Sequence, residues 1–430
     1  MTRPLSVGVA GLGTVGAGVL KLLRDNAEVV AARAGRPIVV TAVSARDRSR
    51  DRGVKLTGLT WHDDPVGLAS DPSVDVVVEL IGGADGPART LVEAAIELRK
   101  PVVTANKAML AVHGAALAAS AERAGVALAF EAAVAGGIPV IKALREGLAG
   151  NRILRIAGIL NGTCNYILTQ MREHGREFAD VLADAQKLGY AETDPSFDID
   201  GIDAAHKLAI LAALAFGRPV AFDAVHVEGI RGVSALDIGF AGELGYVIKL
   251  LGIARQEPGG ISARVHPCMV PRAAPIARVE GVFNAVVAEG DYVGRVMLEG
   301  RGAGAGPTAS AVVADLVDLA RKRTTPVWGA AFDCLSNAPS VPIAAHIGCY
   351  YLRLMVVDRP GVIADVTAVL RDLGVSLESM LQRGRSPGES VPVVLVTHET
   401  QESAMRAALD RIASLDAVLE PPTLIRIEPG

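Results

Sequence analysis

The sequence contains few cysteines, few aromatic residues and no excess of basic residues. Its four cysteines are far apart among 430 residues and form neither a C-x-x-C pair nor a Cys/His cluster with zinc-ligand spacing. We therefore expect reduced thiols in a cytoplasmic protein rather than a disulfide framework. Lysine and arginine total 43 against 47 aspartates and glutamates. This balance argues against a nucleic-acid partner, because nucleic-acid-binding proteins carry a basic excess.

The sequence also lacks an apolar run that is long enough to span a membrane. Residues 5–20 follow Arg3 and resemble the hydrophobic segment of a signal peptide, but this stretch contains five glycines, which weaken a helix. Residues 208–216 form only a short apolar segment, whereas a membrane span needs about 18 or more such residues. We therefore expect no membrane partner.

Hydrophobic residues make up 50% of the chain, and the chain length predicts two or three domains. Strands are predicted at residues 5–10, 38–43, 74–80, 102–104 and 126–130, and helices at 15–32, 87–98 and 108–124. This alternation predicts an α/β domain with a parallel sheet and right-handed crossovers. Ligands of such domains bind at the carboxyl ends of the strands.

A glycine-rich loop of the form G-x-G-x-x-G follows the first predicted strand and precedes a predicted helix. Gly11 permits a tight turn, Gly13 lets the backbone approach a pyrophosphate, and Gly16 lets the helix pack closely on the strand. Thr14 and Val15 complete the loop. The context favours a Rossmann dinucleotide-binding domain. The alternatives are an ordinary Ala/Gly-rich turn and the related loop of a methyltransferase.

The residues after the second predicted strand bear on the choice between NADP and NAD. NAD-preferring domains usually place a carboxylate there to hold the ribose 2′-hydroxyl. Here Arg46 and Arg48 flank Asp47, and arginine suits a 2′-phosphate bidentately. Arg46 therefore favours NADP, while Asp47 leaves NAD open. A solvated basic turn is the alternative without a ligand.

Polar residues follow two further strands of the predicted sheet. Lys107 comes after the strand at 102–104 and is either a contact to nicotinamide or substrate, or a surface lysine. Glu131 opens a stretch of small residues, 131–139, whose carbonyls and carboxylate suit a hard monovalent cation; a domain-linking bend is the alternative.

The sequence predicts a turn that leads into a helix at residues 161–166. Hydrogen-bond donors at the start of that helix would suit an anion.

The stretch from Glu192 to Lys207 is rich in aspartate. An EF-hand loop counted from Asp198 would need glutamate at position 12, where the sequence has Ala209, so we reject a calcium loop. From residue 202 the sequence predicts a helix, which places Asp203 and Lys207 one turn apart on one face. The two residues form either a surface ion pair or a lysine proton donor that an aspartate holds in place.

Taken together, these motifs resemble those of homoserine dehydrogenases over nearly the whole chain. The most specific is A-x-x-x-G-Y-A-E-T-D-P-x-x-D-I-x-G-x-D-x-x-x-K at residues 185–207, which fits the family signature throughout. The glycine loop and the segments at 104–107, 131–139, 161–166 and 300–306 also look like family motifs, in family order.

The resemblance implies a reaction and a set of site residues. The reaction is the reversible NAD(P)H-dependent reduction of L-aspartate 4-semialdehyde to L-homoserine, in threonine, methionine and isoleucine biosynthesis, by a homodimer or homotetramer. The implied catalytic residues are Lys207, as proton donor, Lys107 and Asp203. Substrate binding is implied for Glu192, Asp198, Asp203 and Thr163; cofactor binding for Gly11, Gly13, Thr14, Val15, Gly16, Arg46, Lys107, Gly189 and Gly304; and sodium binding for Glu131 with the carbonyls of Val134, Gly136 and Ile138.

A separate pattern begins after a connector at 338–342. Strands are predicted at 351–357, 375–381, 391–398 and 423–427, helices at 363–373 and 401–414, and a polar hairpin loop at 383–389. This β-α-β-β-α-β order is ferredoxin-like, and with D-R-P-G-V after its first strand it resembles an ACT domain. The resemblance implies L-threonine as a feedback inhibitor, bound near Asp358, Pro360 and Gly361. A dimerisation module with no ligand is the alternative.

The sequence therefore predicts three domains: a Rossmann domain at 1–130, an α+β catalytic and dimerisation domain at 131–340 whose last helices return to the Rossmann domain, and a ferredoxin-like ACT domain at 350–430. Residues 220–300 are placed only by their order. The competing hypotheses are an oxidoreductase for another amino-acid substrate and a non-catalytic nucleotide and amino-acid sensor. A sensor would need a lost lysine or an interrupted aspartate motif, whereas Lys207 and Asp203 are present.

Overall fold

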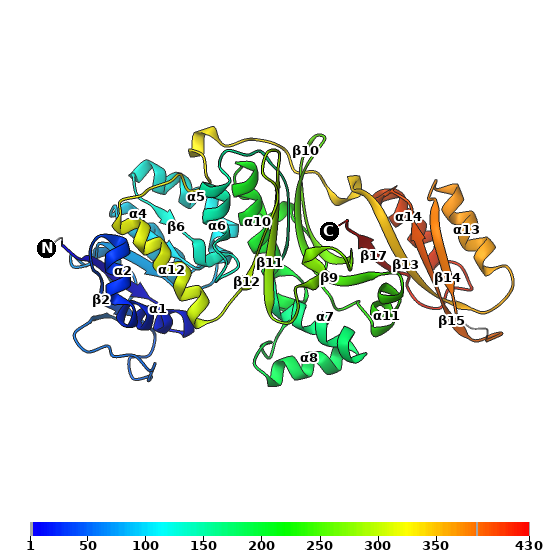
Figure 1. Cartoon of the computed structure of the whole chain (residues 1–430), viewed down its shortest axis with the longest axis horizontal. Coiled ribbons are helices and arrows are strands. Elements are labelled where there is room, and N and C mark those ends of the chain that lie inside the picture. Colours follow the sequence, from blue (N-terminus) through cyan, green and yellow to red (C-terminus); the bar gives the residue numbers. More distant parts are fainter. Residues whose placement is uncertain (1–2, 384–385, 430) are drawn as a thin grey trace.

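The computed structural model describes residues 3–383 and 386–429. Figure 1 shows an elongated molecule, in which the chain runs from an N-terminal region through a central region to a C-terminal region at the opposite end. Residues 1, 2 and 430, at the ends of the predicted first and third domains, and residues 384 and 385 of the predicted hairpin loop lie outside the described residues. No helix within the described residues combines the length and the apolar character that a membrane crossing requires.

The N-terminal region is built around a sheet in the order β3-β2-β1-β4-β5-β6, and its strand pairs are parallel, which confirms the predicted α/β fold. The strands are β1 (Leu5–Ala10), β2 (Ile38–Ser44), β3 (Thr60–His62), β4 (Val76–Glu79), β5 (Val102–Thr104) and β6 (Leu128–Ala129); the helices between β3 and β6 are α3 (Gly67–Ser70), α4 (Pro87–Glu97) and α5 (Lys107–Ala124). The sequence analysis missed β3, because a strand of three residues is too short to show a strand period.

The helix predicted at 15–32 is two helices in the structure, α1 (Thr14–Asp25) and α2 (Ala27–Ala34). Asn26 separates them with φ −111° and ψ 24°, which lie outside the values of an α-helix. The prediction of one helix was wrong, because apolar periodicity continues across a break of a single residue. Asparagine is also a weak helix former.

The chain returns to the N-terminal region through α12 (Ala305–Ala320), which packs on α1. Val312 and Leu316 of α12 lie in the same hydrophobic core as the buried face of α1. A side chain at Gly18 would come within 2.7 Å of the carbonyl oxygen of Ala305, so this close approach requires glycine. The start of α12 therefore lies against α1, two residues past the last glycine of the loop, and the two helices lie side by side (Figure 1).

The central region contributes antiparallel strands covered by helices (Figure 1). The strands are β7 (Ile153–Ile159), β9 (Tyr246–Glu257), β10 (Gly260–Pro271), β11 (Phe283–Gly290) and β12 (Gly294–Arg301), with the short β8 (His226–Val227) parallel to β10; the helices are α6 (Val140–Lys142), α7 (Gly162–His174), α8 (Phe178–Lys187), α9 (Ser196–Ile199), α10 (Ile202–Phe216) and α11 (Ala235–Glu243). Helix α10 contacts both β9 and α5 and is buried over most of its length. A helix buried on all sides holds its polar side chains in fixed positions.

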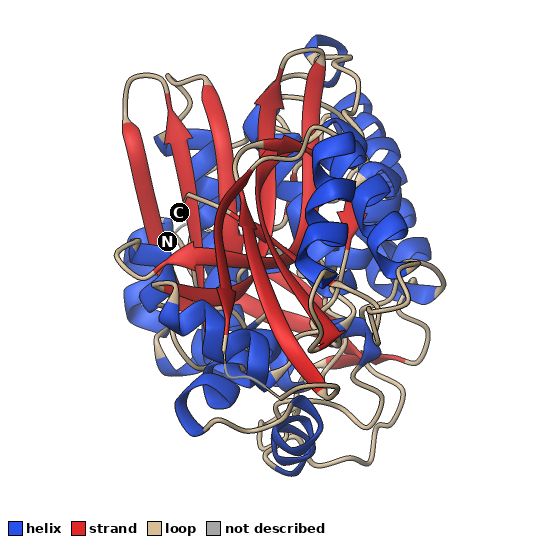
Figure 2. Cartoon of the chain, turned by 90° about the vertical axis from the view of Figure 1, so that its right-hand side faces the viewer, coloured by secondary structure: helices blue, strands red, loops and turns tan. Residues whose placement is uncertain are grey.

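The C-terminal region has the predicted β-α-β-β-α-β order. Its elements are β13 (Ile347–Val357), α13 (Val362–Asp372), β14 (Leu377–Gln382), β15 (Ser390–Thr397), α14 (Glu402–Ala413) and β17 (Thr423–Ile427), with the short β16 (Thr400–Gln401) beside β13. Seen from this end of the molecule, helices flank the strands (Figure 2). The ferredoxin-like prediction is confirmed.

The sheets of the central and C-terminal regions are continuous. The strand order is β12-β11-β7-β9-β10-β17-β13-β15-β14. Strand β17 pairs with β10 in parallel, with Cys268 opposite Arg426 and Met269 opposite Ile427. The sequence analysis did not predict this pairing, since a short contact between distant segments leaves no local pattern in the sequence.

Candidate active site

A cavity of about 600 Å³ lies between the N-terminal and central regions. Its lining includes residues that follow β5 and β6, at the carboxyl ends of the parallel strands, where ligands of this type of sheet bind. Of the residues predicted from the sequence, the lining contains Val15, Lys107, Gly136, Thr163, Gly189, Asp198, Asp203, Lys207 and Gly304. The fold thus brings together residues that are distributed over most of the chain.

The glycine loop has a geometry that only glycine permits. Gly11 has φ +90°, and a side chain there would come within 2.4 Å of the carbonyl oxygen of Leu80. A side chain at Gly16 would come within 2.0 Å of the carbonyl oxygen of Gly11. By contrast, a Cβ at Gly13 would meet no atom of the described residues within 4 Å. The loop therefore leaves open space beside Gly13, where α1 begins, as the predicted pyrophosphate contact requires.

Asp203 lies between two lysine ammonium groups at the cavity. Lys207 Nζ donates a hydrogen bond to Asp203 Oδ2 at 2.7 Å, and Lys107 Nζ lies 3.2 Å from Asp203 Oδ1. Burial works to raise the pKa of Asp203, but the two ammonium groups outweigh burial and lower this pKa to about 2. Asp203 is therefore ionised at neutral pH and holds both lysines by charge.

Lys207 is buried and not part of a surface ion pair. It is 8% exposed, and Asp203 is 5% exposed. Lys207 Nζ also donates a hydrogen bond to the carbonyl oxygen of Leu160 at 2.7 Å. The surface alternative is thus wrong for this pair. The Lys107 side chain, at the start of α5, is more open and 33% exposed.

Asn161 connects the aspartates of the site. Its Nδ2 donates hydrogen bonds to Asp198 Oδ1 at 2.7 Å and to Asp203 Oδ2 at 2.8 Å, while its Oδ1 accepts one from the backbone N–H of Cys164 and caps α7. Burial raises the pKa of Asp198, although the hydrogen bond from Asn161 opposes this effect. The sequence analysis placed Asn161 in a turn but missed its role in the site. Its position as a helix cap was the available signal.

Thr163 links α7 to the loop that follows α8. Its hydroxyl donates a hydrogen bond to the carbonyl oxygen of Tyr190 at 2.8 Å, next to Gly189 at φ +75°. Glu192 follows on the same loop, but its side chain is exposed and does not line the cavity. Gly304 lines the cavity from the other side, at φ +120° before the first residue of α12.

Glu131 is buried beneath the cavity wall and is 2% exposed. Its two carboxylate oxygens accept hydrogen bonds from the backbone N–H groups of Ile141 at 3.0 Å and Lys142 at 2.9 Å. Burial, with a smaller contribution from the nearby Asp315 carboxylate, raises the pKa of Glu131 to about 7. The Lys142 ammonium group lies 3.5 Å from Asp315 and offsets part of the repulsion between the two carboxylates, and a further cation beside Glu131 would offset the rest.

The backbone carbonyls predicted to bind sodium lie in the same buried segment. Val134, Gly136 and Ile138 are buried, and the carbonyl oxygen of Ile138 accepts a hydrogen bond from the N–H of Val140 at 2.7 Å. Gly136 has φ +36° and lines the cavity. Within the described residues, no group of three or more His, Cys, Asp or Glu side chains could hold a metal ion, so any cation here would depend mainly on carbonyl oxygens.

The residues predicted to select the cofactor lie at the end of β2. Arg46 is exposed there. The Asp47 carboxylate accepts hydrogen bonds from the hydroxyl of Ser49 at 2.6 Å and from its backbone N–H at 2.8 Å, and these lower the pKa of Asp47. Asp47 is therefore already engaged within its own turn.

Comparisons with known proteins agree with this geometry. The family model described as "Homoserine dehydrogenase, NAD binding domain" matches residues 11–131, "Homoserine dehydrogenase" matches 139–317, and "ACT domain" matches 350–416. Homoserine dehydrogenases from Pseudomonas aeruginosa and Neisseria gonorrhoeae are 50% and 46% identical to this chain, each over 99% of both sequences. The chain belongs to the homoserine dehydrogenase family.

Solved structures of homoserine dehydrogenases support the same fold. The crystal structure of a homoserine dehydrogenase from Thiobacillus denitrificans matches with a TM-score of 0.94 and 49% identity, over 99% of each chain. A hyperthermophilic archaeal homoserine dehydrogenase in complex with NADPH matches with a TM-score of 0.65 and 26% identity, over 75% of this chain and 100% of that one. The predicted family and fold class are confirmed. As a homoserine dehydrogenase, the chain is an oxidoreductase that acts on a CH–OH group and uses a nicotinamide cofactor.

A second cavity, of about 370 Å³, lies in the ACT domain of this homoserine dehydrogenase. Asp358, Pro360 and Gly361 line it. Gly361 has φ +97° and precedes α13, and Asp358 Oδ2 accepts a hydrogen bond from the backbone N–H of Ser386 at 2.6 Å. The fold therefore brings the three predicted effector-binding residues to one cavity.

Proposed function

We propose that the chain reduces L-aspartate 4-semialdehyde to L-homoserine reversibly, with NADPH as reductant and Lys207 as proton donor. The observation that carries this proposal is the buried Asp203 carboxylate between Lys207 and Lys107, at a cavity that the glycine loop also reaches. The reduced nicotinamide supplies a hydride to the carbonyl carbon when it is bound.

The proposed role of Lys207 follows from the charge that develops during reduction. As hydride reaches the carbonyl carbon, negative charge grows on the carbonyl oxygen, and a nearby ammonium group stabilises it. Lys207 then gives a proton to that oxygen, which completes the alcohol. Asp203 holds Lys207 in place on one side, while the carbonyl oxygen of Leu160 holds it on another.

We assign the ends of the substrate to the acidic and polar groups of the cavity. Asp198 is the carboxylate proposed for the ammonium group of the substrate, since it lines the cavity and is oriented by Asn161. Thr163 lines the same wall. Glu192 remains a proposed substrate ligand, and it would reach the cavity only if its exposed loop turned inward.

The cofactor assignments rest on the glycine loop and the end of β2. Gly11, Gly13 and Gly16 would hold the pyrophosphate at the start of α1, with Thr14 and Val15 in the first turn of that helix. Arg46 supports NADP over NAD, because the competing Asp47 is engaged by Ser49. Gly189, Gly304 and Lys107 would line the nicotinamide end.

The proposal also includes an inhibitor, an oligomeric state and a metal ion. The ACT cavity would bind L-threonine as inhibitor, and the enzyme would be a homodimer or homotetramer.

Glu131 with the carbonyls of Val134, Gly136 and Ile138 would hold a sodium ion. Sodium favours the ionised form of Glu131, so replacing K⁺ with Na⁺ should raise the Tm of the wild type and leave that of Glu131→Gln unchanged.

The assay that tests the proposed function is NADPH oxidation with L-aspartate 4-semialdehyde, followed by absorbance, with and without L-threonine. The wild type should turn over, and L-threonine should slow it. A folded protein that binds NADPH but leaves this substrate unreduced would contradict the substrate assignment. It would favour another amino-acid substrate or a sensor.

A further inference from the structure

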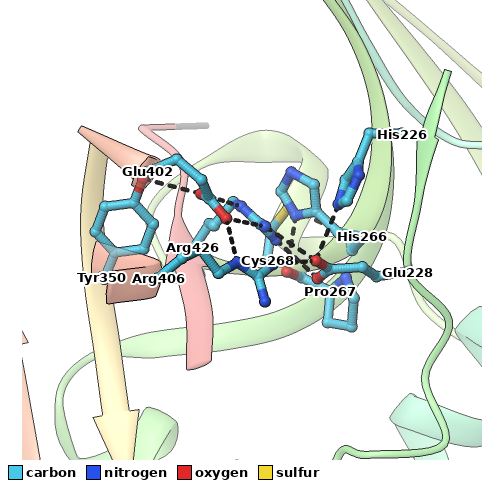
Figure 3. Close-up of polar contacts among 9 residues, drawn as sticks. All are labelled: His226, Glu228, His266, Pro267, Cys268, Tyr350, Glu402, Arg406 and Arg426. Carbon is cyan, nitrogen blue, oxygen red and sulfur yellow. Dashed lines mark hydrogen bonds and ion pairs between the residues drawn. The ribbon is translucent and has the colours of Figure 1, made fainter. Parts of the chain in front are cut away.

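A buried ionic cluster joins the ACT domain to the central region (Figure 3). At its centre, Arg426 of β17 donates hydrogen bonds to Glu228 at 2.8 and 3.0 Å and to Glu402 of α14 at 2.6 and 2.9 Å. Arg426 and Glu402 are each 1% exposed. Arg406 bonds both glutamates from the solvent side, and the hydroxyl of Tyr350 donates to Glu402 at 3.0 Å.

The cluster balances its charges internally. Burial works against the ionised form of Glu228, but hydrogen bonds with His226 and Arg426 outweigh burial and lower the pKa of Glu228. Burial also lowers the pKa of His266, which lies behind the cluster and is neutral. Two arginines therefore face two glutamates. Because removing one member would leave a buried charge unpaired, the cluster fixes Glu228 relative to the ACT domain.

The residues that follow Glu228 lie against α9. A side chain at Gly229 would come within 2.2 Å of the carbonyl oxygen of Ile199, so the two backbones are in direct contact. The N–H of Ile230 donates a hydrogen bond to that same oxygen at 2.8 Å. Arg231 bonds the Asp200 carboxylate and donates to the hydroxyl of Ser196 at 2.9 Å. The segment thus holds both ends of α9.

Helix α9 carries Asp198 into the active-site cavity. We propose that Glu228 is a positioning residue: the ACT domain holds its carboxylate, and the next three residues hold α9 and, on it, Asp198. The ACT domain therefore contributes to substrate binding even without an effector. This inference rests on the proposed function, since it uses Asp198 as the ligand of the substrate's ammonium group.

The test uses the full-length chain and compares three variants. Glu228→Gln keeps the side-chain shape and removes the charge that Arg426 holds. We expect its KM for L-aspartate 4-semialdehyde to rise about tenfold, with kcat reduced less than about threefold and KM for NADPH changed less than about twofold. A general loss of structure would raise both KM values together.

Arg231→Gln loosens α9 from its other contact without touching the ACT domain. Because the Arg231 side chain is 51% exposed, its loss should leave the Tm nearly unchanged while KM for the aldehyde rises about threefold. If Glu228→Gln does not fold, Arg406→Gln replaces it in the test, because the half-exposed Arg406 of α14 also bonds the Glu228 carboxylate. Arg411→Gln is the matched control. Arg411 lies on α14, the helix that carries Glu402, and its ion pair is with Asp372 of α13, away from Glu228, so its loss should leave every kinetic constant unchanged.

Two results would overturn the positioning role. One is an unchanged KM for the aldehyde in folded Glu228→Gln, or in Arg406→Gln where that variant replaces it, and the other is an equal rise in KM for the aldehyde and for NADPH. A wild type without turnover would instead contradict the proposed function. In that case amide hydrogen exchange of residues 196–200 tests the positioning role. Faster exchange in Glu228→Gln than in the wild type supports it, and equal exchange in the two proteins overturns it.

Discussion

Among the buried charges of the described residues, the cluster at the cavity and the cluster at the ACT junction share a plan and have opposite signs. At the cavity, one carboxylate, Asp203, lies between the ammonium groups of Lys107 and Lys207. At the junction with the ACT domain, one guanidinium group, Arg426, lies between two glutamates. Both clusters join segments that are far apart in the sequence.

The clusters differ in what remains open to a ligand. At the junction every guanidinium nitrogen of Arg426 donates to a carboxylate, and the group is enclosed. At the cavity Lys107 is 33% exposed, and both lysines line an open volume. The enclosed ion pairs of Arg426 can therefore act only on the structure, whereas the lysines at the cavity can also contact a ligand and stabilise charge that develops on it.

The largest predicted effect is on catalysis by the cavity cluster. Lys207→Met should lower kcat about 10³-fold, because the variant lacks the proposed proton donor, with the Kd for NADPH changed less than about twofold. Steady-state kinetics and NADPH fluorescence titration would measure both. Lys187→Met, at an exposed lysine of α8, is the control and should behave as wild type. Loss of cofactor binding together with turnover would argue against a proton donor.

Substitutions in the junction cluster should lower the free energy of unfolding rather than kcat. Arg426→Gln removes the buried cation between Glu228 and Glu402 and leaves only the half-exposed Arg406 to pair them, so the free energy of unfolding should fall by about 3–5 kcal/mol. Urea denaturation checks this value. A loss below about 1 kcal/mol would mean that the cluster does not hold the ACT domain in place.

Acid should weaken the cavity cluster in a defined pH range. The pKa of Asp203 is lowered from 3.8 to about 2 in the folded protein, so its ionised form stabilises the fold above about pH 4, and this contribution of about 2 kcal/mol is lost as pH falls toward 2. Wild type should therefore exceed Asp203→Asn in stability at neutral pH. Urea denaturation should show the difference narrowing toward pH 2. A difference that stays constant with pH would contradict the pairing.

The smallest predicted effect comes from the exposed edge of the junction cluster. The Arg406 side chain is 47% exposed, and Arg406→Gln should cost less than about 1 kcal/mol of unfolding free energy. The same denaturation series measures it beside Arg426→Gln. Equal losses in the two variants would show that enclosure of the ion pairs does not decide their contribution.

The sequence predicted the parts of the fold and site that depend on neighbouring residues. The strand, glycine loop and helix at Gly11 to Gly16 form one local unit, and the spacing of Asp203 and Lys207 places both on one helical face. The break at Asn26 was missed, because it changes a single residue within a continuing apolar pattern.

Contacts between distant segments could not be predicted from local patterns. The approach of Lys107 to Asp203 was implied only by the family resemblance, and the hydrogen bonds of Asn161 to the aspartates were not predicted at all. Residues 220–300 received no site assignment. The pairing of Glu228 with Arg426 depends on the pairing of β17 with β10, and no short sequence pattern predicts that strand pairing.

The most direct test of the account measures kcat and the free energy of unfolding together in Lys207→Met and Arg426→Gln. The account predicts that Lys207→Met loses turnover and at most about 2 kcal/mol of unfolding free energy, because Lys107 stays beside Asp203. It predicts that Arg426→Gln loses about 3–5 kcal/mol and keeps the kcat of its folded fraction. If Arg426→Gln lost turnover while stable, or Lys207→Met kept turnover, the assignment of chemistry to the cavity and of structure to the junction would be contradicted.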